Sequence, residues 1–183
     1  MAGILKVDKY QDFNGNDIMT SDGAGNITLS SNMTTAVQAV GSANTPAFFA
    51  QKNATQSPGN NAFTKITYET EVLDTNNAFA SSTFTVPSGE AGKYFIGFNK
   101  HNNKGGLTAE DYTAIYKNGS SLENFPHFGG ASPTIMKSQQ IIVDLAVGDY
   151  LEIYHYGTTT NSSAGSLLSG ARNSFYGYKI IGA

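Results

Sequence analysis

The sequence predicts an all-β fold, arranged as a sandwich or jelly roll of at least eight antiparallel strands. From Thr45 onward, short runs of Val, Ile, Thr, Tyr and Phe recur at a regular spacing, separated by Gly, Asn, Asp and Pro. Within these runs the pattern alternates with a period of two, which is typical of strands, and no convincing amphipathic helix interrupts the series. A length of 183 residues suits one main domain.

The segment before this series is expected to be an arm and a linker, so the predicted division is residues 1–44 and 45–183. A hairpin is predicted where Asp17–Ser21 and Asn26–Ser30 flank Asp22-Gly23-Ala24-Gly25, because these glycines suit a turn that needs positive φ. Two short strands bury too little surface to be stable alone. We therefore expect the arm to dock on another protein.

The expected strands of residues 45–183 differ in one respect from those of a simple sandwich. Along Tyr150–Tyr156, tyrosines and Glu152 face one way while Leu151, Ile153 and His155 face the other, so neither face is wholly polar. A strand that is covered on both sides shows this pattern, which favours an interface beyond the core of one chain. In chain order the strands are predicted in PAFFAQKN, FTKITYETEVL, SSTFTVP, GKYFIGFN, DYTAIYKNG, QQIIVDLA, DYLEIYHYG and SFYGYKIIGA.

The composition excludes several classes of partner. Charged residues make up 14% of the chain and the formal net charge is −3, so no extended basic surface is available to bind nucleic acid. Without cysteine, neither a disulfide framework nor a thiolate metal site can form. Because no run of about 18 apolar residues occurs, insertion into a membrane is not expected, and the amino terminus lacks the pattern of a signal peptide.

Residues that could perform chemistry are few and scattered. His101, His127 and His155 lie far apart in the sequence and have no metal-ligand spacing. Asp149 follows a tight turn and is expected to cap its backbone amides. An enzymatic alternative, such as a glycan hydrolase, would need two acidic groups about 5–10 Å apart in a cleft. We therefore expect no enzyme activity, no cofactor and no metal.

Six stretches after Pro46, taken together and in order, resemble the globular head of C1q-type proteins. This resemblance runs from Pro46 to the end of the chain. It implies a C1q/TNF-like jelly-roll sandwich of about ten antiparallel strands, assembled as a compact homotrimer around an apolar axis. The matching stretches are Ala47–Ala50, Phe84–Pro87, Gly92–Phe98, Tyr116–Gly119, Val143–Leu151 and Ser174–Tyr178.

By position, Phe98, Phe175 and Ile180 match the axis-facing residues of the family, so the resemblance implies that they form the trimer interface. The alternative is that these three side chains fill the core of the single chain. Some family members bind calcium in a loop near the trimer apex, but the corresponding stretch here has Glu123 as its sole carboxylate. Calcium binding is therefore not expected.

The loops at one end of the predicted sandwich are candidates for ligand binding. We select His101, Phe125, His127 and Phe128, because amphipathic and aromatic rings suit the surfaces that bind sugars or proteins. The alternative for these rings is ordinary packing in the core and at its rim. A recognition module that binds carbohydrate or protein, such as a receptor-binding domain, is the second functional hypothesis.

The first hypothesis comes from the amino terminus. No collagen-like repeat precedes the predicted jelly roll, whereas Ile4-Leu5-Lys6-Val7-Asp8 resembles the start of virion appendage proteins of tailed bacteriophages. We therefore expect a non-enzymatic virion structural protein, assembled in the host cytoplasm, that decorates a capsid or forms a head or tail fibre. Residues 1–44 would bind other capsid or tail proteins, and the trimer would project outward toward a host surface glycan or protein.

Overall fold

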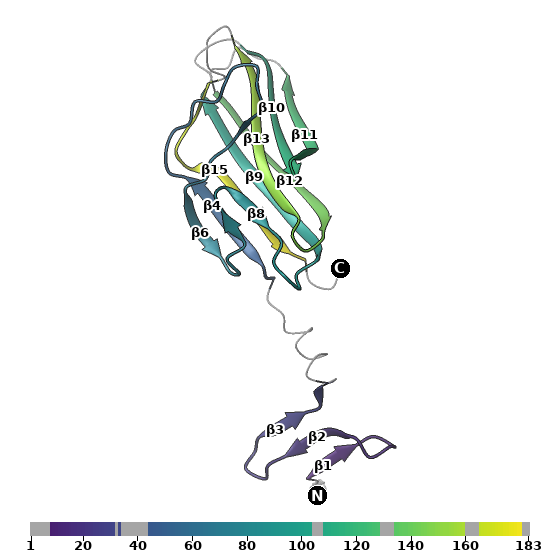
Figure 1. Ribbon diagram of the computed structural model, residues 1–183. Coiled ribbons are helices and arrows are strands. Elements are labelled where there is room, and N and C mark those ends of the chain that lie inside the picture. Colours follow the sequence, from purple (N-terminus) through teal and green to yellow (C-terminus); the bar gives the residue numbers. More distant parts are fainter. Residues whose placement is uncertain are drawn as a thin grey trace, which may run out of the picture. The chain divides into compact units, whose positions relative to one another are not determined.

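The structure is a computed structural model that describes residues 8–31, 33, 44–103, 108–128, 134–159 and 165–180. The chain divides into two compact units, Met1–Ala43 and Asn44–Ala183. The described residues contain fifteen β-strands, most of them labelled in Figure 1, and the prediction of an all-β fold is confirmed. Part of the predicted arm and linker, residues 1–7, 32 and 34–43, lies outside the described residues.

The smaller unit contains a three-stranded antiparallel sheet in the order β1-β2-β3. Its strands are β1 (Lys9–Gln11), β2 (Asp17–Ser21) and β3 (Ile27–Leu29). The predicted hairpin is confirmed, since Met19 pairs with Leu29 and Ser21 pairs with Ile27. The sequence analysis missed β1, which pairs with β2 through Tyr10 and Met19. Short Gly-rich turns join all three strands.

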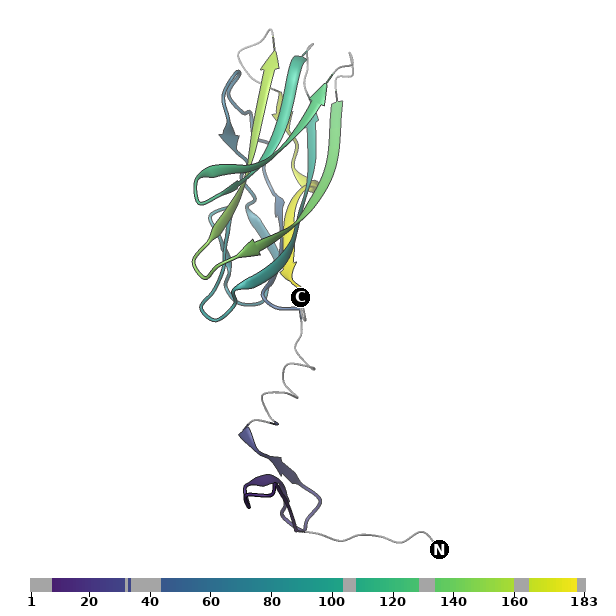
Figure 2. The ribbon, with the colours of Figure 1, turned by 90° about the vertical axis from the view of Figure 1, so that its right-hand side faces the viewer.

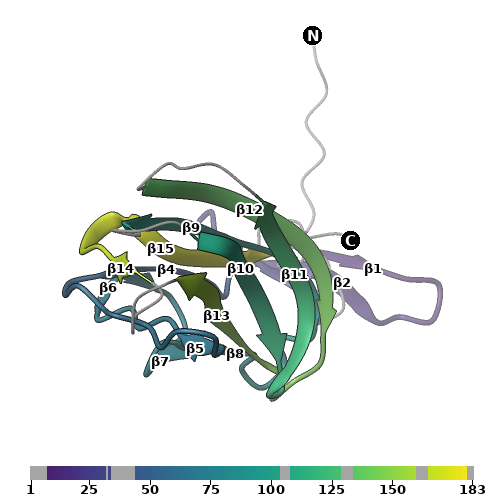
Figure 3. The ribbon, with the colours of Figure 1, turned by 90° about the horizontal axis from the view of Figure 1, so that it is seen from above.

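The larger unit is a sandwich of two antiparallel sheets, which lie as two layers in Figure 3. One sheet has the order β12-β9-β15-β4-β6, with β14 also paired to β9, and the other has the order β11-β10-β13-β8-β7, with β5 also paired to β13. In chain order the strands are β4 (Ala47–Lys52), β5 (Thr64–Lys65), β6 (Thr70–Asp74), β7 (Phe79–Ala80), β8 (Thr83–Thr85), β9 (Gly92–Asn103), β10 (Thr108–Lys117), β11 (Ser120–Phe128), β12 (Thr134–Leu145), β13 (Tyr150–Thr159), β14 (Ser166–Leu167) and β15 (Gly170–Lys179).

The core lies between the two sheets and is rich in aromatic rings. Phe48 is at its centre, with ring centroids 4.6 Å from Phe84, 4.8 Å from Phe175 and 5.3 Å from Phe79. These four rings come from β4, β8, β15 and β7, so they join strands of both sheets. Their side chains are buried together with Ile96, and burial of this apolar surface is the main term that stabilises the sandwich.

Two tight turns set the positions of the long strands, whose hairpins are visible in Figure 2. Asn118 and Gly119, between β10 and β11, both have positive φ, of 53° and 77°, which is the geometry of a type I′ hairpin turn. Between β12 and β13, Asp149 caps the turn as predicted, because its carboxylate accepts a hydrogen bond from the Ala146 amide at 2.8 Å. Hydrogen bonds from Lys117, Asn118 and that amide lower the pKa of Asp149 to about 2.

Candidate functional site

The outer face of the β12-β9-β15-β4-β6 sheet carries a row of aromatic side chains. Because residues alternate along a strand, the buried positions Tyr94 and Ile96 place Phe95 outward on β9. The Phe95 ring stacks on Tyr178 of β15, with centroids 5.3 Å apart. Phe49 of β4 and Tyr176 of β15 lie beside them, with centroids 6.3 Å apart. We call Phe49, Phe95, Tyr176 and Tyr178 the aromatic face.

A glycine on the central strand allows this face to lie close to the sheet. Gly97 of β9 is the register partner of Tyr176, and a Cβ at this position would stand 2.6 Å from the tyrosine ring. With hydrogen in place of a side chain, Gly97 leaves room for the ring across β9. On the far side of β9, Gln140 of β12 donates a hydrogen bond to the Tyr176 hydroxyl at 3.2 Å. Tyr176 therefore connects three adjacent strands.

The edge strand β12 adds two exposed apolar side chains to this side of the sheet, Ile142 opposite Phe95 and Met136 further along, opposite His101. Met136 and Ile142 are 70% and 66% exposed, and their even spacing places both on the side of Gln140. Monomeric proteins rarely expose contiguous apolar patches of more than a few hundred Å². Aromatic residues and methionine are also enriched at protein interfaces. The aromatic face with Met136 and Ile142 is therefore the candidate assembly surface.

Two of the three residues predicted for the trimer interface do not lie on this surface. Phe98 and Phe175 are 0% exposed and belong to the core between the sheets. The alternative reading of these two side chains, as filling of the core of the single chain, is the one that the structure supports. Phe98 packs on Phe125 with ring centroids 5.5 Å apart. The third residue, Ile180, is half-buried just after β15, where its amide donates to the Lys93 carbonyl at 2.8 Å.

The predicted ligand-binding residues are not loop residues in the structure. His101 lies within β9 and is buried, with its backbone amide and carbonyl both paired to the Asn173 side chain at 2.8 and 2.9 Å. Phe125 and His127 lie in β11 and are half-buried, Phe125 against the core. The backbone of Phe128 ends β11, and its side chain lies outside the described residues. The Asn118-Gly119 turn folds this stretch back as a strand, which the sequence analysis did not predict.

A cluster of polar side chains lies inside the sandwich, and the sequence analysis missed it. Lys100 of β9, Asp111 of β10 and His155 of β13 are all 0% exposed, and Lys137 of β12 is nearly buried. Lys100 Nζ contacts Asp111 Oδ1 and lies 3.2 Å from His155 Nδ1. Lys137 Nζ lies 3.4 Å from Asp111 Oδ1, and Asn102 Nδ2 donates to Asp111 Oδ2 at 3.4 Å. We call these five residues the interior cluster.

A second buried lysine shows how the fold ordinarily accommodates such a side chain. Lys52 of β4 donates to the Thr67 carbonyl at 2.8 Å and lies 3.4 Å from a Glu69 carboxylate oxygen. Burial lowers the pKa of Lys52, and the negative charge of Glu69 offsets part of this effect. Glu69 is partly exposed, so this ion pair reaches solvent. The interior cluster differs because the side chains of Lys100, Asp111 and His155 are 0% exposed and that of Lys137 is only 7% exposed.

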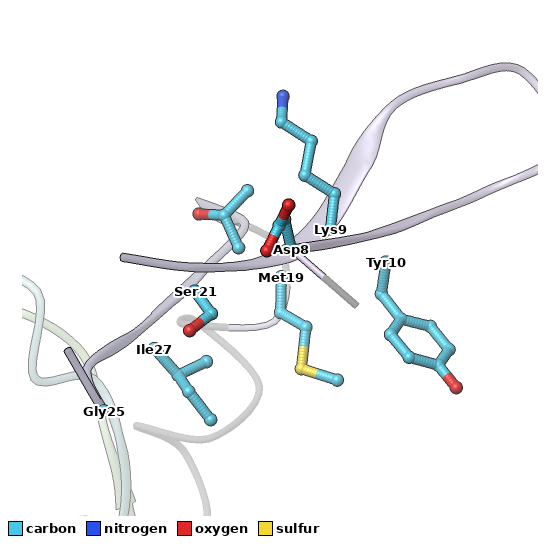
Figure 4. A pocket seen from close by; sticks show the side chains of 8 residues that line it. Asp8, Lys9, Tyr10, Met19, Ser21, Gly25 and Ile27 are labelled. Atoms are coloured by element: carbon cyan, nitrogen blue, oxygen red, sulfur yellow. The ribbon is translucent and has the colours of Figure 1, made fainter. Parts of the chain in front are cut away.

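The smaller unit presents an apolar face of its own. A groove of about 300 Å³ on its sheet is lined by Tyr10, Met19 and Ile27, among others. Figure 4 shows these three side chains projecting to one side of the sheet, whereas Lys9 projects to the other. Ile27 and Tyr10 are exposed. Within the described part of this unit, no second layer covers the groove.

The two turns of the smaller unit repeat one arrangement. In each, an aspartate carboxylate accepts hydrogen bonds from two backbone amides of the turn and from the side chain of the asparagine four residues later. Asp12 is bound in this way by Asn16 Nδ2 at 2.9 Å, and Asp22 by Asn26 Nδ2 at 2.6 Å. The asparagine hydrogen bond is the largest cause of the lowered pKa of both carboxyl groups. Local polar bonds thus hold the three strands where little core is available.

Metal-ligand groups and membrane-spanning helices are further features to consider within the described residues. Among them, no group of three His, Cys, Asp or Glu side chains is placed to hold a metal ion. In the same part of the chain, no helix is long and apolar enough to cross a bilayer. The assembly surface, the interior cluster and the apolar face of the smaller unit are therefore the features to be explained.

Comparison with known proteins finds likeness in fold only. No family model and no curated protein matches the sequence. Among solved structures, the globular domain of zebrafish complement 1qA protein aligns with a TM-score of 0.56 at 19% identity, over 74% of this chain and 97% of that one. The larger unit is a C1q/TNF-like jelly roll. Murine APRIL also aligns with this chain, with a TM-score of 0.54 at 13% identity, over 73% of this chain and 98% of APRIL.

Proposed function

We propose that this chain is a non-enzymatic structural protein that assembles as a homotrimer through the aromatic face. In this proposal the C1q/TNF-like unit projects outward, and residues 1–44 attach it to a larger particle. The observation that carries the proposal is the apolar surface formed by the four aromatic rings and by Ile142, which pairs with Phe95, with Met136 exposed further along the same strand. An assembly role is the simplest reason for a fold to leave this much apolar surface uncovered.

Further copies of this chain are the occupant that we propose for this surface. A homotrimer is the assembly that the C1q-like resemblance of the sequence implies. The surface is formed by a regular sheet, and the Gly97 position keeps the Tyr176 ring close to it, so identical faces can approach one another. Its centre has rings from β9 and β15, whereas the charged pair Lys93 and Asp144 lies at the start of β9 and the end of β12. An apolar centre with a polar rim is typical of protein interfaces.

Replacing Ile142 with aspartate is expected to convert the trimer to monomers. Assembly would bring three unpaired carboxylates into an apolar interface, which costs about 3–5 kcal/mol for each uncompensated buried charge. The measurement is solution mass by light scattering at matched concentrations, with circular dichroism to verify that the sheet is retained. Val147→Asp is the matched control, because Val147 is also exposed but lies in the β12–β13 turn.

We expect Val147→Asp to remain a trimer. If the unmodified chain is itself a monomer, the homotrimer proposal is wrong. The aromatic face would then be a binding surface for a different protein, in line with a recognition module. If the C1q/TNF-like unit assembles by itself, the shorter fragment Thr45–Ala183 should also be a trimer, with a solution mass three times that of one fragment chain.

The particle that we propose is a tailed-bacteriophage virion, with the protein serving as a capsid decoration or a head or tail fibre. The Ile4–Asp8 resemblance supports this placement. The smaller unit supports an attachment role, because three short strands with the exposed apolar side chains of Tyr10 and Ile27 suit docking on another protein. Attachment by this unit leaves the C1q/TNF-like unit available to contact a host surface.

Deletion of Met1–Ser30 is expected to abolish incorporation into particles while leaving the trimer folded. Purified virions assembled with the full-length or shortened protein would be compared by mass spectrometry of their proteins. A milder variant, Ile27→Asp, changes the groove of the smaller unit and should reduce incorporation in the same direction, because it places a charge among apolar side chains. Particles that contain the shortened protein at the normal level would contradict the attachment role.

A further inference from the structure

The interior cluster brings an amine and a carboxyl group into contact from opposite sheets. Lys100 belongs to β9, Asp111 belongs to β10, and these strands lie in different layers of the sandwich in Figure 3. Both side chains are 0% exposed, and Lys100 Nζ contacts Asp111 Oδ1. We propose that these two side chains react with each other to form an intramolecular amide, which covalently joins the two sheets.

The neighbouring groups have the roles that this reaction requires. His155 Nδ1 lies 3.2 Å from Lys100 Nζ, where it can accept the proton that the amine must lose. The same nitrogen lies 3.9 Å from Asp111 Oδ2, where it can return a proton to the departing oxygen. Nucleophile, proton acceptor and electrophilic carbon are therefore within reach of one another.

Two further groups stabilise the charge that develops on the carboxyl oxygens. Asn102 Nδ2 donates to Asp111 Oδ2 at 3.4 Å, and the Lys137 ammonium lies 3.4 Å from Oδ1. Lys137 is itself held in place, because its Nζ donates to the Asp111 and Phe125 carbonyls at 3.1 and 2.8 Å. Fixed donors of this kind stabilise an oxyanion most strongly where solvent is excluded.

Enclosure also favours the product over the separate charges. Burying a carboxylate and an ammonium removes the solvation of both, and their attraction repays this cost only in part. The reaction needs the uncharged amine and the protonated acid, and transfer of one proton from Lys100 to Asp111 across their contact converts the ion pair to these forms. The amide is neutral, so the site retains a charge on Lys137 but no longer encloses a separate ion pair.

The atoms balance without any oxidant or co-reactant. The uncharged Nζ of Lys100 attacks Cγ of the protonated Asp111 carboxyl and gives one proton to His155. The resulting carbon loses one oxygen, which leaves as water after it receives the proton from His155. One C–N bond forms, one C–O bond breaks, and one water molecule is released.

Mass spectrometry of the denatured full-length protein tests this proposal. The unmodified chain is expected to be lighter than its sequence mass by one water molecule, whereas Lys100→Arg, prepared in the same way, should have its full sequence mass. After trypsin digestion, cleavage should fail at Lys100, and the peptide Tyr94–Lys104 should be joined to Gly105–Lys117. A chain of full sequence mass that is cleaved after Lys100 would overturn the proposal.

A matched control lies within the same protein. Lys65 Nζ is 2.6 Å from Glu152 Oε1, but both side chains are partly exposed, so ordinary cleavage after Lys65 is expected.

Asp111→Asn identifies the reacting carbon, because attack on an amide releases ammonia in place of water. Loss of water that persists in Asp111→Asn would contradict the assignment to Asp111. If this variant does not fold, the digest of the unmodified chain still decides the question.

Discussion

Asp111→Ala is expected to lower the free energy of unfolding by about 3–5 kcal/mol, because it leaves buried lysine charges without their carboxylate. Lys100 and Lys137 both contact the Asp111 carboxylate, which is 0% exposed. The expectation is the same in direction whether Lys100 is held by an ion pair or by the proposed amide. Chemical denaturation of the full chain, followed by circular dichroism, measures the change.

Asp144→Ala is the matched control for this experiment. Asp144 also pairs with a lysine, Lys93, at 2.8 Å, but its side chain is 75% exposed. Exposed ion pairs contribute about 0–1 kcal/mol, so a small effect is expected. Equal losses in the two variants would mean that Asp111 is not enclosed in the folded protein. In that case the interior cluster could not have the properties argued from its burial.

Phe175→Ala is expected to lower the free energy of unfolding by about 3–5 kcal/mol, through lost apolar burial and the cavity that remains. The Phe175 ring lies 4.8 Å from Phe48, 5.8 Å from Tyr68 and 5.9 Å from Phe79, measured between centroids. These contacts join β15 to the opposite sheet as well as to β4. Equilibrium denaturation at two protein concentrations measures the loss and shows whether it depends on assembly.

Phe63→Ala is the control for the core variant. Phe63 is 44% exposed and packs on Tyr156 at 5.0 Å, so its removal should cost much less than removal of Phe175. If Phe175→Ala instead left the stability of the monomer unchanged and only dissociated the trimer, Phe175 would face the axis after all. The pair of variants therefore separates a core residue from an interface residue.

Much of the fold was predictable from local patterns. Period-two runs located most of the long strands of the larger unit, and Asp22-Gly23-Ala24-Gly25 predicted the β2–β3 hairpin. Phe125, His127 and Phe128 were expected in a loop, whereas the structure places them in β11. The pairing of β11 with β10 along this stretch depends on the turn at Asn118-Gly119 and on a neighbouring strand, which no local window contains.

The orientation of the strands was harder to predict than their existence. On β9 the set Tyr94, Ile96 and Phe98 alternates with Phe95, and both sets are apolar. Periodicity separates two faces of a strand but does not say which face lies in the core when both are apolar. A shift of one residue exchanges the two faces completely. Family position assigned Phe98 and Phe175 to the interface, whereas the packing of the sheets buries both.

The interior cluster was not predictable for a related reason. Lysine, aspartate and histidine are mostly found at the surface, and Lys100 precedes a polar and Gly-rich stretch that looks like a loop. The burial of Asp111 and His155 becomes visible only when β10 and β13 are paired and covered by β9. One signal was present: Tyr94, Ile96 and Phe98 place Lys100 on the inward side of β9 if the strand continues.

Strand β9 contributes to the interior cluster on its inner side and to the aromatic face on its outer side, so its register determines both. Its residues pair with β12 without a register shift, from Gly92 opposite Leu145 to Asn103 opposite Thr134. A slip of one residue would turn Lys100 toward solvent and Phe95 into the core at the same time. Neither the interior cluster nor the aromatic face can therefore form on a misaligned strand. A chain with a correctly formed aromatic face therefore also has a correctly formed interior cluster. Assembly through this face would select for completely folded chains.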